Sequence, residues 1–121
     1  MEESILYTVR SMIGGEEEYS DSDPFNLDLI MYINSIFGIL NQLGIGVEGF
    51  MITGPDETWS EFLEGSNVSL NEVQTYVVLR VRILFDPPTS STVFQSINEM
   101  IKELTWRMTT KVEVTNVRDQ M

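Results

Sequence analysis

The side chains of this chain that are best suited to chemistry are carboxylates gathered in a short acidic segment. The cluster comprises Glu16, Glu17, Glu18, Asp21 and Asp23. Spaced carboxylates bind calcium, but an EF-hand loop also needs a glycine at its sixth position and a closing glutamate. Pro24 and Phe25 interrupt that spacing, and the glycine is missing. We therefore expect a solvated acidic loop that holds neither a metal nor any other cofactor.

Catalytic groups are scarce. The chain has no histidine and no cysteine, which excludes disulfides, Cys-based zinc sites, Ser–His or Cys–His nucleophile pairs and imidazole acid–base chemistry. Two carboxylates in an apolar pocket could hydrolyse a glycosidic bond, but a turn explains Asp86, and a solvated helix face explains Glu99 and Glu103. The sequence predicts no enzymatic activity.

Two side chains are candidates for contact with a partner. Trp106 falls on the polar side of a predicted helix, with Glu99 and Lys102. Either another helix of the same chain covers it, or it meets a second subunit, since aromatic anchors are enriched at interfaces. Arg80 falls instead on an apolar face beside Val77. A buried arginine needs a carboxylate, which either the same chain or a neighbouring subunit supplies.

The elements that must position these residues follow from apolar periodicity. It predicts helices over residues 4–13, 25–43, 58–63 and 70–85, and a further one from the residues after Pro88 as far as Met108. Asp23-Pro24 is a good helix start, and Gly44 suits the left-handed residue that ends a helix. Two Ser/Thr–Glu pairs have the spacing of a capping box: Thr58 with Glu61, and Ser69 with Glu72.

The segment 70–85 has two interpretations. Its second half alternates in apolar character and is rich in β-branched residues, which favours a strand. Its length, the predicted capping box and the prolines that follow favour a buried helix. We prefer the helix.

The junction Asp86-Pro87-Pro88 predicts a sharp change of direction. The residue before a proline is pushed out of the helical region, and the prolines lack backbone donors. The hydroxyls of residues 89–91 can then cap the next helix. A helical hairpin should result.

The C-terminal residues change character. Lys111-Val112-Glu113-Val114-Thr115 alternates like a strand, without a partner strand in an otherwise helical chain. We expect residues 109–121 to form an extended tail that is either disordered or ordered by pairing with a partner. Its interface candidates are Lys111, Val112, Val114 and Val117. The predicted fold is therefore all-α: a small bundle of four to five helices (residues 1–108) with a long acidic loop and this tail (109–121).

Charge is distributed unevenly. The net charge is −12, carried by residues 1–64, which hold thirteen acids against Arg10 alone; residues 65–121 are neutral. Such a field repels phosphate backbones and anionic membranes, and no apolar run reaches the length of a membrane span. The charge could serve solubility alone. It would also suit an acidic DNA mimic or antagonist that occupies the basic site of a nucleic-acid-binding protein.

Several motifs resemble one family in a shared order. They are residues 28–34 (DLIMYIN), 42–46 (QLGIG), 58–63 (TWSEFL), 84–91 (LFDPPTSS) and 101–107 (IKELTWR). Together they resemble the head–tail connector, or head-completion adaptor, proteins of long-tailed bacteriophages, over roughly residues 25–108. The acidic loop and the residues after Thr110 lie outside the resemblance.

The resemblance implies a helical adaptor without catalysis, located at the head–tail interface of the virion. Such proteins form a ring, usually of twelve copies, beneath the portal protein. The ring extends the DNA channel, through which DNA passes without specific binding, and offers a platform to the stopper or tail-completion protein. In such a ring the acids Glu16, Glu17, Glu18, Asp21 and Asp23 become candidates to face the channel, where they would repel DNA.

Overall fold

The computed structural model describes residues 3–14 and 23–120, with the side chains of residues 115–120 excepted. Within these residues the chain forms five helices and no strand: α1 (Ile5–Gly14), α2 (Phe25–Gln42), α3 (Trp59–Phe62), α4 (Leu70–Phe85) and α5 (Ser91–Gln120). The all-α prediction is confirmed. So is the helical interpretation of residues 70–85, since burial on several sides outweighs the strand-like alternation.

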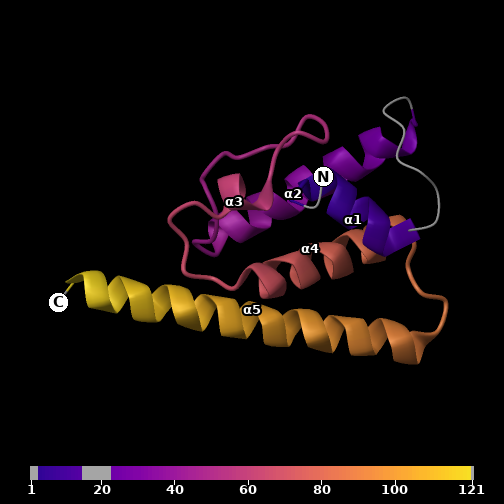
Figure 1. Cartoon of the computed structure of the whole chain (residues 1–121). Coiled ribbons are helices and arrows are strands. Elements are labelled where there is room, and N and C mark those ends of the chain that lie inside the picture. The colour runs from indigo at the N-terminus through magenta and orange to yellow at the C-terminus, as the bar shows by residue number, and fades with distance from the viewer. Residues whose placement is uncertain (1–2, 15–22, 121) are drawn as a thin grey trace.

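Helix α4 lies at the centre of the bundle. It packs against α1, α2 and α5, and its residues Val73, Tyr76, Val77 and Val81 are buried. Figure 1 shows α5 running along one side of α4, while α2 and the loop after it lie on the other side. A helix surrounded in this way needs apolar groups around most of its circumference, which explains the thin polar stripe of this segment.

An aromatic cluster joins α2 to α3 and to the loop between them. The Phe37 ring stacks on Phe62 with 4.0 Å between centroids, and it meets Trp59 and Phe50 edge-on. The predicted capping box at α3 is confirmed: the Glu61 backbone N–H donates to the Thr58 hydroxyl, and the Thr58 N–H donates to the Glu61 carboxylate. This short helix therefore holds two aromatic rings in the core.

Other helix ends differ from the prediction in detail. Ser69 begins α4 without a side-chain capping bond, so the second predicted capping box is wrong. Asp23 precedes the N-cap of α2 by one residue, yet its carboxylate accepts the Phe25 backbone N–H at 3.0 Å. Gly44 has φ +84°, as expected of the residue that ends α2.

The proline junction forms the predicted hairpin. Helix α4 ends with the Asp86 N–H donating to the Arg82 carbonyl at 2.8 Å. Helix α5 then begins beside Ser90, whose hydroxyl accepts the Val93 N–H at 3.4 Å. The corner therefore sets α5 back along α4.

The predicted extended tail is wrong, because α5 continues from Ser91 to Gln120 without a break at residue 108. A helix that already exists adds residues at low cost, whereas a lone strand has no partner for its backbone groups. The hydroxyls of Thr109 and Thr110 donate to the carbonyls of Thr105 and Trp106, at 2.8 and 2.7 Å. The threonine hydroxyls thus find hydrogen-bond acceptors within the helix. The segment with the alternating pattern is helical and does not form a strand.

Candidate partner-binding surfaces

The outward side of α5 carries the most exposed aromatic side chain of the described residues. The inward side packs on the bundle through Ile97, Ile101, Leu104 and Met108. Trp106 points away from that side and is 67% exposed. Of the two alternatives for this tryptophan, coverage by another helix of the same chain is therefore excluded within the described residues.

Trp106 lies in a shallow groove along α5. We call this groove the Trp106 face; it is lined by Ser96, Glu99, Met100, Lys102, Glu103 and Trp106. Met100 is also exposed, at 52%. Glu103 is paired with Arg107 one turn further on, with 2.7 Å between Oε1 and Nη2. The face therefore combines an exposed ring and a thioether with charges of both signs, a composition that suits a protein partner better than a small ligand.

Arg80 is partly buried, and its guanidinium lies over the Tyr76 ring, 5.3 Å from the centroid. No carboxylate of the described residues forms an ion pair with it. Its Nε and the Tyr76 hydroxyl are both buried without a hydrogen-bond partner in the described structure. Of the two alternatives for Arg80, an intrachain carboxylate is thus absent from the described residues, and the cation–π contact stabilises the guanidinium there.

The tail candidates fall on different sides of α5. Lys111 Nζ lies 3.6 Å from the Glu72 carboxylate of α4. Val112 packs against the core and covers Gly44, where an added Cβ would come within 3.1 Å of its Cγ1. Val114 is 48% exposed. Val117 lies in the helix, and its side chain is outside the described residues. Only Val114 of these four is thus shown as an uncovered apolar side chain.

Of the five acidic candidates, the structure describes Asp23. Glu16, Glu17, Glu18 and Asp21 lie outside the described residues. Asp23 is bound: Arg10 Nη2 donates to its Oδ2 at 2.9 Å, and the Asp23 side chain is 27% exposed. The Phe25 N–H and then the Arg10 guanidinium lower the pKa of Asp23 below its ordinary value. Its charge is therefore largely compensated by Arg10 and is not offered alone to a partner.

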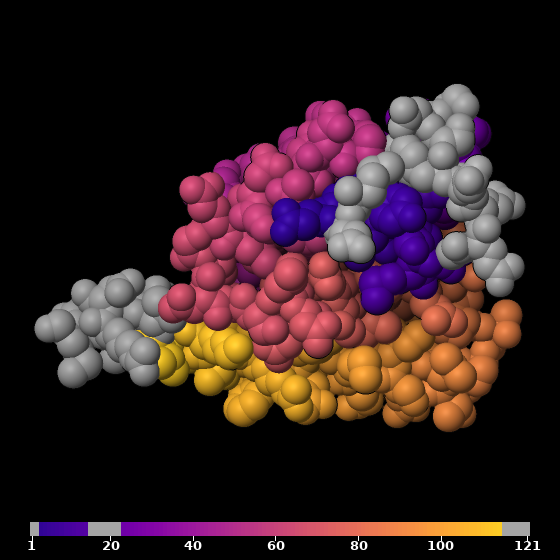
Figure 2. Space-filling model, viewed as in Figure 1, coloured from indigo at the N-terminus to yellow at the C-terminus, as the bar shows by residue number. Residues whose placement is uncertain are grey.

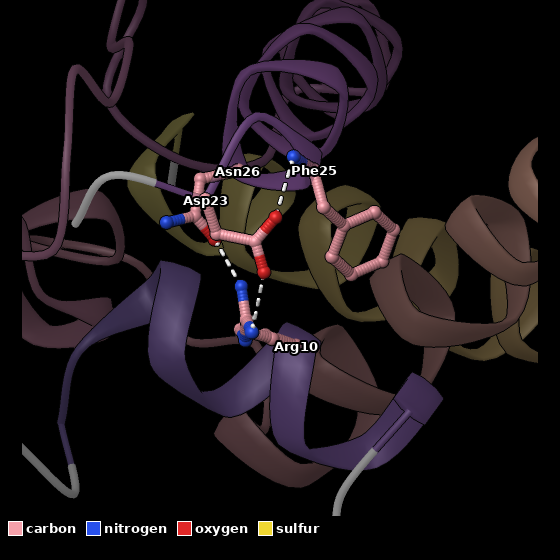
Figure 3. Close-up of polar contacts among 4 residues, drawn as sticks. All are labelled: Arg10, Asp23, Phe25 and Asn26. Carbon is pink, nitrogen blue, oxygen red and sulfur yellow. Dashed lines mark hydrogen bonds and ion pairs between the residues drawn. The ribbon is translucent and has the colours of Figure 1, made fainter. Parts of the chain in front are cut away.

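Sequence reasoning missed the contacts of Arg10. Arg10 is buried in α1; its Nη1 donates to Asn26 Oδ1 at 2.6 Å, and its guanidinium lies 5.5 Å from the Phe25 ring centroid. Figure 3 shows Asp23 and Asn26 converging on it from the start of α2. A clue was present: Arg10 is the single base among thirteen acids of residues 1–64, so a specific carboxylate partner was to be expected.

Sequence reasoning also passed over exposed apolar residues on α2 and its loop. Leu27, Met31 and Met51 are 71%, 58% and 62% exposed. The signal was available, since Leu27 and Met31 are spaced one helical turn apart outside the apolar face of Leu29, Ile33 and Phe37.

Other kinds of site find little support in the part of the chain that the structure describes. No group of three metal-ligating side chains occurs there. None of the described helices combines the length and the apolar character that a membrane crossing requires.

Comparison with known proteins identifies a family. The model of a family described as phage connector protein matches residues 5–115. No curated protein and no solved structure matches the chain. The family match extends over all five helices, including most of α5, and so reaches beyond the motifs recognised in the sequence.

Proposed function

We propose that this chain is the adaptor that completes the phage head. The chain belongs to the phage connector protein family, whose members are structural components of the virion. It assembles as a ring, of twelve copies, under the portal protein. The ring extends the DNA channel and docks the stopper or tail-completion protein. DNA passes through it without specific binding.

The exposure of Trp106 is the observation that carries this proposal. A large aromatic side chain left 67% exposed on the last helix buries little apolar area in the isolated chain, and burial at an interface would remove it from water. The 30 residues of α5 also give the chain a long, regular surface for neighbours. We propose that Trp106 contacts the adjacent protomer.

Arg80 and the end of α5 complete the proposed interface. A guanidinium without a carboxylate among the described residues is a ready partner for an acid of a neighbouring subunit. The second half of α5, with Lys111, Val112, Val114 and Val117, is proposed to contact the portal or a neighbouring subunit as a helix, not as an added strand.

The acidic residues Glu16, Glu17, Glu18 and Asp21 are proposed to face the channel and to repel DNA; this rests on the charge of the sequence alone. Asp23 contributes less, because Arg10 neutralises it. A map of the assembled ring with residues 16–28 on its outer wall would refute this part. The DNA-mimic alternative explains the acidic charge, but it does not account for the match of residues 5–115 to the phage connector protein family.

The test is docking on DNA-filled heads that display the portal and lack the connector. We expect the wild-type chain to bind and Trp106→Ala to lose ring formation while keeping its helical content. Met12→Ala is the control, since Met12 is similarly exposed, at 61%, but lies on α1. Unaltered ring formation by Trp106→Ala would remove Trp106 from the interface, and failure of the wild-type chain to bind would refute the connector proposal.

The contribution of the end of α5 is tested separately by Val114→Asp. This change puts a charge on an exposed position and so leaves the core intact. We expect weaker docking on the same heads with unchanged stability. Docking equal to that of the wild-type chain would show that this part of α5 does not meet the portal.

A further inference from the structure

Two of the apolar surfaces that remain uncovered in the described residues lie on different elements and matter here. One is the Trp106 face of α5, defined above. The other, which we call the Met31 face, consists of Leu27 and Met31 on α2 and Met51 in the following loop; all three side chains are more than half exposed.

The Met31 face is held together by hydrogen bonds. Asn34, one turn after Met31, donates from Nδ2 to the Ile52 carbonyl at 3.0 Å, and its Oδ1 accepts the Ile52 N–H at 2.8 Å. These two hydrogen bonds fix the backbone next to Met51 against α2. Met31 and Met51 are therefore held on neighbouring segments, and Leu27 lies one turn before Met31 on α2.

The two faces belong to helices that lie on opposite sides of α4. Helix α4 packs against both α2 and α5, and α2 with its loop lies on the far side of α4 from α5 (Figure 1). In the space-filling view α5 forms the lower border of the molecule, and residues of the loop form its upper border (Figure 2). One copy can therefore use both faces at once, as head-to-tail contacts in a ring require.

Charge favours contact between unlike faces. Apart from Arg10, which is bound to Asp23 and Asn26, every lysine and arginine of the chain belongs to α4 or α5. Asp28 is exposed beside Leu27, so two Met31 faces brought together would place like charges close to each other. The Trp106 face has mixed charge: it carries Lys102 beside Glu99 and the Glu103–Arg107 ion pair, so it repels Asp28 less than a second Met31 face would.

We infer that the Trp106 face of one copy packs on the Met31 face of the next copy. The indole ring meets flexible thioethers, which make favourable contacts with aromatic rings, and Lys102 approaches the acidic surroundings of Asp28. The inference rests on the proposed connector function, and it names which two surfaces of the chain form the repeated contact.

The absence of cysteine from the sequence makes the pairing directly testable. Met31→Cys and Met100→Cys are prepared as single-cysteine proteins and assembled on portal-bearing heads, separately and as an equal mixture. A short bis-maleimide is then added. We expect a cross-linked dimer in the mixture and none in either protein alone. The double variant should give a ladder of multimers. Met12→Cys mixed with Met100→Cys is the control and should give no dimer.

Each other outcome is decisive. Cross-linking of Met31→Cys with itself would show a symmetric contact and overturn the inference. Docking of the cysteine variants without a dimer in the mixture would overturn the pairing of these faces and leave the connector function standing. Failure of the wild-type chain to dock would overturn the connector function, and the pairing with it.

Discussion

The body of the protein (α1 to α4 with the connecting loop) and helix α5 are built differently. Core residues of the body such as Leu29, Phe37 and Val77 are completely buried. Of the core residues of α5, Met108 is completely buried as well, whereas Ile97 and Leu104 retain 9% and 8% exposure. The body also contains the polar contacts of Arg10 and Asn34, while a single ion pair within the described residues, Lys111 with Glu72, joins α5 to it. The body therefore supplies stability, and α5 is an outer layer that leaves one side available to partners.

The largest expected effect separates the body from α5. Phe37→Ala removes a ring that packs against three other aromatic rings, and it should lower the free energy of unfolding by about 3–5 kcal/mol. Leu104→Ala, on the side of α5 that packs on the bundle, should cost about 2–3 kcal/mol, near the lower end for such changes. Urea denaturation of both variants measures the difference. Equal losses would contradict the division into a body and an outer layer.

The loop of the body should be nearly as sensitive at one glycine. Gly46 has φ +82°, and an added Cβ would collide with the Phe62 ring. Gly46→Ala combines a left-handed backbone with overpacking and should cost about 2–5 kcal/mol. Gly49, with φ +78° and nothing within 4 Å of an added Cβ, is the matched control, and Gly49→Ala should cost only about 1–2 kcal/mol. Equal costs, measured by urea denaturation, would show that this loop is not part of the core.

The polar contacts of the body should make its stability depend on acid. The pKa of Asp23 is lowered in the folded protein from its ordinary value of 3.8, through the Phe25 N–H and Arg10. Ionised Asp23 therefore contributes to the free energy of unfolding in full above that value, and this contribution is lost as the pH falls through the lowered pKa. Asp23→Asn should be less stable than wild type at neutral pH and should lose less stability between pH 5 and pH 2.

The control for this dependence is Asp28→Asn, which changes an exposed carboxylate on the same helix. Thermal unfolding followed by circular dichroism across that pH range compares the three proteins. If Asp23→Asn lost as much stability in acid as the wild type, the Arg10 contact would not stabilise the folded body.

Local signals explain why much of the body was predictable. Periodicity, glycine positions and the Thr58–Glu61 spacing all act over a few residues, and the helices they predict agree closely with α1 to α4. Ser69 shows the limit, because the same spacing is present without the side-chain capping bond. The sequence left two alternatives for Trp106, coverage by another helix of the chain or contact with a second subunit. Only the tertiary structure could show that the side chain is exposed.

Long-range contacts account for what was missed. The bond from Arg10 to Asp23 joins positions thirteen residues apart, and Asn34 binds a backbone eighteen residues away. No local pattern encodes either contact. The end of α5 was mispredicted because alternation was weighed without the preceding helix, which lowers the cost of continuing, and without Gly44, against which Val112 packs.

The smallest expected effect concerns the ion pair between α5 and the body. Lys111 is 49% exposed and lies 3.6 Å from Glu72, so Lys111→Ala should lower the free energy of unfolding by less than about 1 kcal/mol, and by less still in high salt. Arg107→Ala is the control, since it breaks an exposed pair that lies wholly within α5. Urea denaturation at low and high salt compares the two variants. If Lys111→Ala lost much more stability than Arg107→Ala, a charge contact would fix α5 to the body. If both variants lost little, the force that holds α5 there would be the apolar packing of Ile97, Ile101, Leu104 and Met108.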